Sequence, residues 1–131
     1  MDIPGKVAPF CHSLLRLVAG LLFLEHGTSK FLDFPHSQYS GTELMSMAGF
    51  AGSIELIGGL LITLGLFTRP AAFIASGTMA VAYFMAHAPQ SFFPLINGGA
   101  EAILYCFVFL YLAAAGGGPI SLDAIVRKTS G

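Results

Sequence analysis

The stretch LLRLVAGLLFLEHGTSKFL, Leu14–Leu32, joins a long apolar run to three titratable residues in its last third. At a rise of ~1.5 Å per residue it covers most of the ~30 Å hydrocarbon core of a bilayer. Glu25, His26 and Lys30 would then lie inside the membrane, where a charged group costs at least ~2.5–3.5 kcal/mol on insertion scales. The sequence therefore predicts that these three side chains face protein or trapped water instead of lipid.

Composition extends this prediction to the whole chain. Of the 131 residues, 55% are hydrophobic and 10% are charged, and the mean hydropathy is +0.77, whereas soluble domains carry about 25% charged residues. The net charge of −1 offers no basic surface for nucleic acid. The N-terminal MDIPGKVAPFCHSLLR lacks the basic region and cleavage site of a signal peptide. We therefore expect a membrane protein of one domain, residues 1–131, whose first apolar run is retained as a span.

Four apolar segments are long enough to serve as membrane spans, and no strand pattern competes with them. Pro70 separates the second from the third, and a break at 88–91 separates the third from the fourth. The predicted fold is all-α, a four-helix transmembrane bundle with spans at about 10–31, 44–67, 70–87 and 97–115. Ser121 can cap a short C-terminal helix, SLDAIVRK, whose apolar residues would lie on the membrane surface.

Lysine and arginine residues near the span ends predict the orientation of the bundle. One side holds most of them, and the other side holds only Lys30. The residues on the first side are Lys6, Arg16, Arg69, Arg127 and Lys128. We therefore expect both termini and the Arg69 turn in the cytoplasm, with the loops 33–43 and 88–96 outside. Arg16 is expected to extend to lipid phosphate or to pair with Asp123.

Polar side chains from all four predicted spans fall at a similar depth on the outward side. His26 and Lys30 are four residues apart and share one helix face. Glu55 is flanked at helical spacing by Gly52 and Gly59, which allow close backbone approach. We predict an outward-facing polar cavity whose residues handle protons. Its candidate residues are Glu25, His26, Lys30, Glu55, His87, Asn97 and Glu101, with Tyr83, Tyr105 and Arg69 as secondary candidates.

Pairing between helices is the structural alternative to a functional cavity. Intramembrane hydrogen bonds contribute on average ~0.6 kcal/mol, which is small against the insertion cost of so many charged groups, so the cavity is favoured. A metal site from His26, His87 and a carboxylate is chemically conceivable, but no short-spaced ligand motif is present, and no metal is predicted. Cys11 and Cys106 form no CxxC pair and are interpreted as buried small hydrophobes.

Three motifs together resemble the DoxX family of small bacterial membrane proteins. They are LLRLVAGLLFLEHGTSKF, GFAGSIELIGGLLITLGLFTRPAA and NGGAEAILY, and they lie within Leu14 to Tyr111. The resemblance implies a four-helix protein of the bacterial inner (cytoplasmic) membrane. One relative forms part of a thiosulfate:quinone oxidoreductase, and others are linked to quinone resistance or to thiol and oxidative-stress complexes. The family's motif positions here are His26, Gly27, Lys30, Glu55, Gly58, Gly59, Arg69, Pro70, Asn97 and Glu101.

Three functions are compatible with these observations. The first is a redox-associated membrane subunit, an oxidoreductase component that binds a quinone or a similar small molecule in the cavity and works with a soluble or membrane redox partner. The second is a small-solute or proton-coupled carrier, which with four spans would need a homodimer. The third is a non-catalytic scaffold that anchors soluble redox enzymes to the membrane. We favour the first.

Overall fold

The structure is a computed structural model that describes residues 3–130, with side chains as far as residue 127. All of its regular elements are helical, and no strand occurs within residues 3–130, so the predicted all-α fold is confirmed. In chain order the elements are α1 (Ile3–Leu32), α2 (Met47–Leu64), α3 (Thr68–Ala82), the π-helical turn η1 (Tyr83–His87), the 3₁₀ turn η2 (Ala88–Gln90), α4 (Pro94–Asn97), α5 (Ala100–Ala115) and α6 (Leu122–Ser130).

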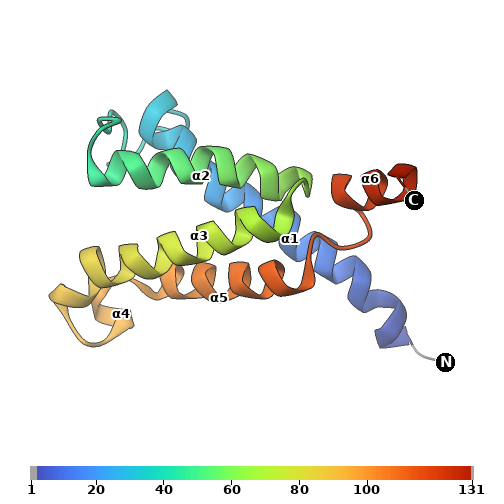
Figure 1. Ribbon diagram of the computed structural model, residues 1–131. Coiled ribbons are helices and arrows are strands. Elements are labelled where there is room, and N and C mark those ends of the chain that lie inside the picture. Colours follow the sequence, from blue (N-terminus) through green and yellow to red (C-terminus); the bar gives the residue numbers. More distant parts are fainter. Residues whose placement is uncertain (1–2, 131) are drawn as a thin grey trace.

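The helices form two pairs. Figure 1 shows α1 beside α2 and α3 beside α5, and these are the two most extensive helix contacts. The α2–α3 turn at 65–67 lies at the same end of the bundle as the start of α1 and as α6, and we call this the terminal end (Figure 1). The opposite end is built from residues 33–46 and 83–99. We call it the cavity end, because the cavity described below opens there.

Three helical segments among the described residues are long and apolar enough to cross a membrane: Ile3–Leu32, Met47–Leu64 and Thr68–Gln90. The fourth, Ala100–Ala115, is shorter and spans about 24 Å at the helical rise. Together they make a transmembrane helical bundle.

Some predicted boundaries need correction. The helix α1 begins at Ile3, seven residues before the predicted start of the first span, so Pro9 lies inside the helix. The helix α2 begins after Ser46, whose hydroxyl accepts a hydrogen bond from the Gly49 N–H at 3.0 Å. It ends before Gly65, which has a φ of 71° that favours glycine.

Residues 97–99 do not continue into the last span, contrary to the prediction. The helix α4 ends at Asn97, and Gly98 adopts a φ of 73°. Only from Ala100 does the chain resume as α5. Asn97 and Glu101, which were both predicted to lie in the last span, therefore belong to different elements.

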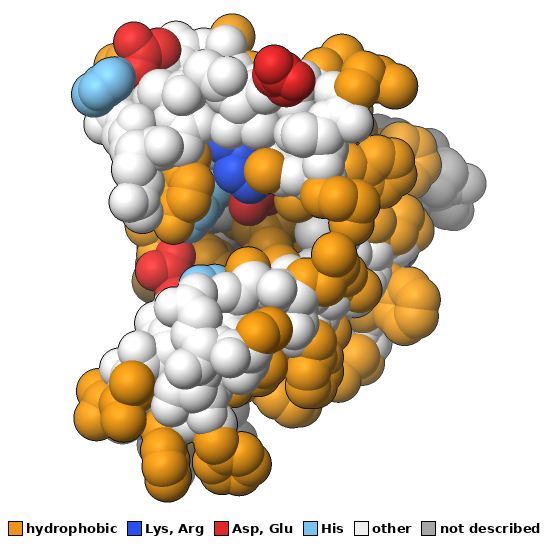
Figure 2. Space-filling model, turned by 90° about the vertical axis from the view of Figure 1, so that its left-hand side faces the viewer, with side chains coloured by type: hydrophobic (Ala, Val, Ile, Leu, Met, Phe, Trp, Pro, Cys, Tyr) orange, Lys and Arg blue, Asp and Glu red, His pale blue; other side chains and the backbone are white. Residues whose placement is uncertain are grey.

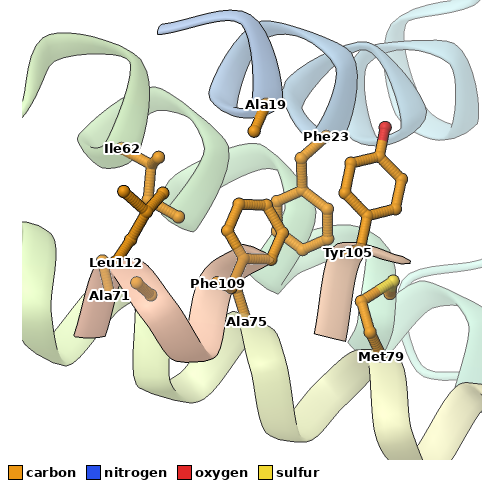
Figure 3. Close-up of a cluster of buried hydrophobic side chains, with 10 residues drawn as sticks. Ala19, Phe23, Ile62, Ala71, Ala75, Met79, Tyr105, Phe109 and Leu112 are labelled. Carbon is orange, nitrogen blue, oxygen red and sulfur yellow. The ribbon is translucent and has the colours of Figure 1, made fainter. Parts of the chain in front are cut away.

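The core lies where the two pairs meet. Figure 3 shows Phe23 from α1 against Phe109 and Tyr105 from α5, and the ring centroids of Phe23 and Phe109 are 4.8 Å apart. The buried cluster comprises Ala19, Phe23, Ile62, Ala71, Ala72, Ala75, Met79, Tyr105, Phe109 and Leu112. Within the first pair, a Cβ at Gly27 would lie 2.6 Å from the Leu56 nitrogen. Glycine at this position therefore lets the α1 and α2 backbones touch.

The sequence predicted that Arg16 extends to lipid phosphate or pairs with Asp123, but its side chain is buried at 4% exposure and its hydrogen bonds go to backbone carbonyls. Its Nη2 donates to the Ile120 carbonyl at 2.8 Å, and its Nη1 donates to the carbonyls of Ile62 and Thr63 at 3.4 Å each. The last carbonyls of a helix lack partners within that helix. Arg16 therefore joins the end of α2 to the chain before α6. Both cysteines were also predicted to be buried, but Cys11 is exposed and Cys106 is half-buried.

Asp123 secures the start of α3. Its carboxylate accepts hydrogen bonds from the backbone N–H groups of Phe67, at 2.8 Å, and Thr68, at 3.0 Å. Partial burial raises the pKa of Asp123, but these bonds and the charge of Arg127 outweigh burial, and the net pKa lies below its usual range. Phe67 has a φ of 50°, which costs energy in a non-glycine residue. The carboxylate thus stabilises a strained turn.

Candidate functional site

A cavity of about 1000 Å³ opens at the cavity end. Figure 2 looks at this end and shows a hollow between two lobes, with blue, red and pale-blue side chains inside it and hydrophobic side chains around it. The wall formed by α1 and α5 carries most of its charged groups, and the facing walls of α2 and α3 are mainly apolar. The polar lining residues are His26, Lys30, Tyr39, Glu55, Thr78, His87, Gln90, Glu101 and Tyr105.

Lys30 and Glu55 form a buried ion pair at this cavity. The Lys30 Nζ lies 2.7 Å from Glu55 Oε1, and the two side chains are 10% and 5% exposed. Close packing of α1 on α2 brings them together, because a Cβ at Gly52 would lie 3.0 Å from the Lys30 side chain. Both residues also line the cavity. The pair is therefore largely buried and also borders the open space of the cavity.

His26 and Glu101 form a second contact, between α1 and α5. The His26 Nε2 lies 3.2 Å from Glu101 Oε1, with side-chain exposures of 31% and 65%. The His26 Nδ1 lies 2.9 Å from the Leu22 carbonyl and can only donate to it. In neutral imidazole Nε2 would then lack a proton, so the contact with Glu101 is an ion pair only when the imidazole carries a proton on both nitrogens. The His26 ring also meets Tyr105 edge-on, with centroids 5.9 Å apart.

Of the candidates predicted near the ends of the third and fourth spans, His87 lines the cavity, whereas Asn97 and Tyr83 hold a turn together. His87 lines the cavity, and its Nδ1 donates to the Asn97 carbonyl at 3.0 Å. The Asn97 side chain is buried and donates to the Tyr83 hydroxyl at 3.1 Å and to the Ser91 carbonyl at 2.9 Å. Neither Asn97 nor Tyr83 is a lining residue. These two residues close the turn that follows η1.

Two further candidates lie away from the cavity. Glu25 is exposed and is not a lining residue, although it neighbours His26 in sequence. Arg69 lies at the terminal end, where its Nη1 donates to the Ala114 carbonyl at 2.7 Å. The structure therefore brings together five of the seven principal candidates and the secondary candidate Tyr105, and it separates the rest. The five are His26, Lys30, Glu55, His87 and Glu101.

Sequence reasoning missed the apolar half of the lining. It consists of one face of α2 and the facing side of α3 and η1. The main residues are Met47, Phe50, Ala51, Ile54, Ile74, Gly77, Val81 and Met85. Their signal in the sequence is spacing at i, i+3, i+4 and i+7, but lipid-facing residues show the same spacing. Apolar periodicity alone therefore could not separate a cavity wall from a lipid surface.

The cavity combines a polar wall and an apolar wall, which is typical of sites for small amphipathic molecules. The ammonium group of Lys30 can donate hydrogen bonds, and the contact between His26 and Glu101 can exchange a proton with a ligand. Among the residues that the structure describes, no three His, Cys, Asp or Glu side chains are grouped as metal ligands.

Comparisons with known proteins give one family and two relatives. The family model described as DoxX matches residues 12–88. A protein of Haemophilus influenzae, described as "Uncharacterized protein", is 46% identical over 123 residues, which cover 90% of this chain and 92% of the relative. A protein of Bacillus subtilis, described as "Putative oxidoreductase CatD", is 33% identical over 119 residues, which cover 88% of this chain and 86% of the relative. No solved structure matches the chain.

Proposed function

Because the chain belongs to the DoxX family of integral membrane proteins, we propose that it is a redox-associated membrane subunit that binds a quinone or a similar small molecule in this cavity. His26, Lys30, Glu55 and Glu101 provide its polar contacts and proton exchange. The oxidoreductase name of the relative from Bacillus subtilis supports the redox association.

The observation that carries this proposal is the position of the Lys30–Glu55 ion pair beside an open cavity. A charge within the membrane costs at least ~2.5–3.5 kcal/mol, and an intramembrane hydrogen bond returns on average only ~0.6 kcal/mol. If the pair served only to join α1 and α2, close-packed apolar side chains would join them at lower cost. A hydrogen-bonding ligand in the cavity gives a reason to retain both charges.

The residues can be assigned roles from their chemistry. Lys30 donates a hydrogen bond to a carbonyl oxygen of the ligand, while Glu55 holds the ammonium group in place. Reduction of a quinone to a quinol takes up two electrons, which the partner protein supplies, and two protons, one at each oxygen. In this proposal the contact between His26 and Glu101 passes one proton to the second ligand oxygen, and the Lys30 ammonium group passes the other to the first. Quinol oxidation returns both protons to these groups and both electrons to the partner.

We also propose an orientation for the protein. In it the cavity end faces the outside of a bacterial cytoplasmic membrane, and both termini lie in the cytoplasm. The basic residues Arg16, Arg69 and Arg127 at the terminal end support it. Alkaline phosphatase, which is active only outside the cytoplasm, should be active when inserted at Gly41 and inactive when fused after residue 131. The opposite pattern would reverse the orientation.

Binding of a ubiquinone analogue to the purified protein tests the proposed ligand. Wild type should bind it saturably, and Glu55→Gln and His26→Ala should each weaken binding about tenfold, or ~1.4 kcal/mol. Glu43→Gln and His36→Ala are the matched controls, because both side chains are exposed and outside the cavity lining. His26→Ala keeps the test decisive if Glu55→Gln fails to fold. Binding that does not saturate in wild type, or that both cavity variants leave unchanged, would contradict the proposal.

A further inference from the structure

The gap between α2 and α3 has the properties of an opening toward the bilayer. The two helices are joined by the short turn at 65–67 at the terminal end, yet farther along the bundle their facing sides line the cavity. Phe50 on α2 is 69% exposed, and Ile74 and Val81 on α3 are 55% and 54% exposed. Large apolar side chains that line a cavity and are also this exposed lie at its mouth and not on its floor.

The depth of this mouth places it among lipid chains. Ile74 and Gly77 follow Thr68 by six and nine residues along α3, which corresponds to about 9 and 14 Å at the helical rise. The hydrocarbon core is ~30 Å thick. The exposed sides of α3 at these positions therefore meet acyl chains and not water.

Gly77 keeps this mouth open. Apart from its chain neighbours and the backbone of its own helix, a Cβ built at this position has no atom within 4 Å, although the residue lies in the interior of α3. The glycines that pack α1 against α2 differ, because a Cβ at Gly59 would lie 2.7 Å from the Leu24 Cα. Close helix packing therefore gives no reason for glycine at 77, and a side chain there would project into free space at the cavity.

From these observations we infer that the ligand is a membrane-resident molecule with a polar head and an apolar tail. The tail lies in the slot between α2 and α3 and extends into the bilayer, while the head reaches Lys30 and Glu55. This inference rests on the proposed function and adds the ligand class and its route. It follows from the order of groups along the cavity, which runs from a buried ion pair to exposed apolar residues at the depth of the lipid chains.

Two probes with the same ring separate the slot from the head site: a ubiquinone analogue with a decyl tail, and the ring without a tail. Both are titrated into protein in lipid nanodiscs of phosphatidylcholine. Gly77→Trp should weaken binding of the tailed probe about tenfold relative to wild type and leave the tail-less probe within about twofold. Each probe partitions into the lipid to the same extent for every variant. The ratio of the variant's dissociation constant to that of wild type is therefore independent of partitioning. Phe73→Trp is the matched control, since Phe73 is 66% exposed on α3 but does not line the cavity, and it should change neither affinity.

Val81→Trp provides a second obstruction of the slot if Gly77→Trp fails to fold. The inference about the slot would be wrong if the tailed probe bound both variants as tightly as wild type, or if both probes lost affinity equally. Neither result would contradict binding of the head at Lys30 and Glu55. Failure of wild type to bind either probe would instead contradict the proposed function, and this inference with it.

Discussion

The two ends of the bundle each bury a basic side chain, but they satisfy it in different ways. At the terminal end Arg16 donates to backbone carbonyls of α2 and of the chain before α6. At the cavity end Lys30 pairs with Glu55, and the pair borders a cavity of about 1000 Å³. The first arrangement satisfies helix-end carbonyls that need partners. The second places a buried carboxylate and ammonium group beside open space.

On the proposed function, Arg16 has a structural role only, whereas Lys30 also contacts the ligand. Substituting a charge that binds helix ends should change stability alone. Substituting a charge beside a cavity should change both stability and binding, and the loss of stability should be recoverable by removing its partner as well. Burial alone does not distinguish the two cases, because Arg16 and Lys30 are 4% and 8% exposed.

The largest effect is expected for Lys30→Met. This substitution leaves the Glu55 carboxylate buried without its partner, and the free energy of unfolding should fall by about 3–5 kcal/mol. Unfolding in mixtures of dodecylmaltoside and sodium dodecylsulfate measures this change. Ligand binding should also be lost.

The double variant Lys30→Met/Glu55→Met is the control for this prediction. It removes both charges and should regain most of the stability, while binding stays absent. If the double variant were as unstable as Lys30→Met, the ion pair would be structural and the contrast between the two ends would fail.

Arg16→Met should have the next largest effect, about 3 kcal/mol. Hydrogen bonds from charged donors contribute about 1.5–3 kcal/mol each, and two of the three here are long. Binding of the ubiquinone analogue, measured on the fraction that remains folded, should match wild type. A selective loss of binding in this variant would show that the two ends are coupled.

The sequence predicted the helices well because the membrane restricts the choice of structure. Backbone polar groups in hydrocarbon must be satisfied within the segment, so a long apolar run becomes a helix whatever its neighbours. The breaks were harder to predict. Gly98 and Gly99 precede an apolar run and look like its first turn, but the Asn97 side chain accepts a hydrogen bond from the Gly99 N–H at 2.8 Å and stops the helix there.

The candidate site was predicted in part, for reasons that particular residues make clear. His26 and Lys30 share a helix face, and both line the cavity. On an α-helix the side chain of Glu25 points about 100° away from that of His26. Helical geometry alone could therefore have excluded Glu25 from the face that carries His26 and Lys30. The environment of Arg16 could not be predicted, because its shortest hydrogen bond joins residues 104 positions apart.

A smaller effect, about 1 kcal/mol, is expected for Asp123→Asn at neutral pH. An amide oxygen replaces the carboxylate that accepts from the N–H groups of Phe67 and Thr68. The folded protein holds the pKa of Asp123 below its usual range, so its stabilisation is full above the unfolded pKa of about 3.9. It is lost as the pH falls through the lower folded pKa. The stability difference from wild type should therefore be constant from about pH 5 to 8 and shrink below about pH 4. A difference that grew on acidification would contradict this assignment.

The smallest stability effects, below about 1 kcal/mol, are expected for Glu101→Gln and Glu25→Gln, because both carboxylates are exposed. The two variants should differ in their affinity for the ubiquinone analogue. Glu101 lines the cavity and contacts His26 at 3.2 Å, so its substitution should weaken binding several-fold by removing the proton partner of that imidazole. Glu25 contributes nothing to the lining, and its variant should bind as wild type does. Parallel titrations of the ubiquinone analogue make this comparison. Equal affinities for the two variants would mean that negative charge near the cavity end acts at long range, and that the contact between His26 and Glu101 has no special part in binding.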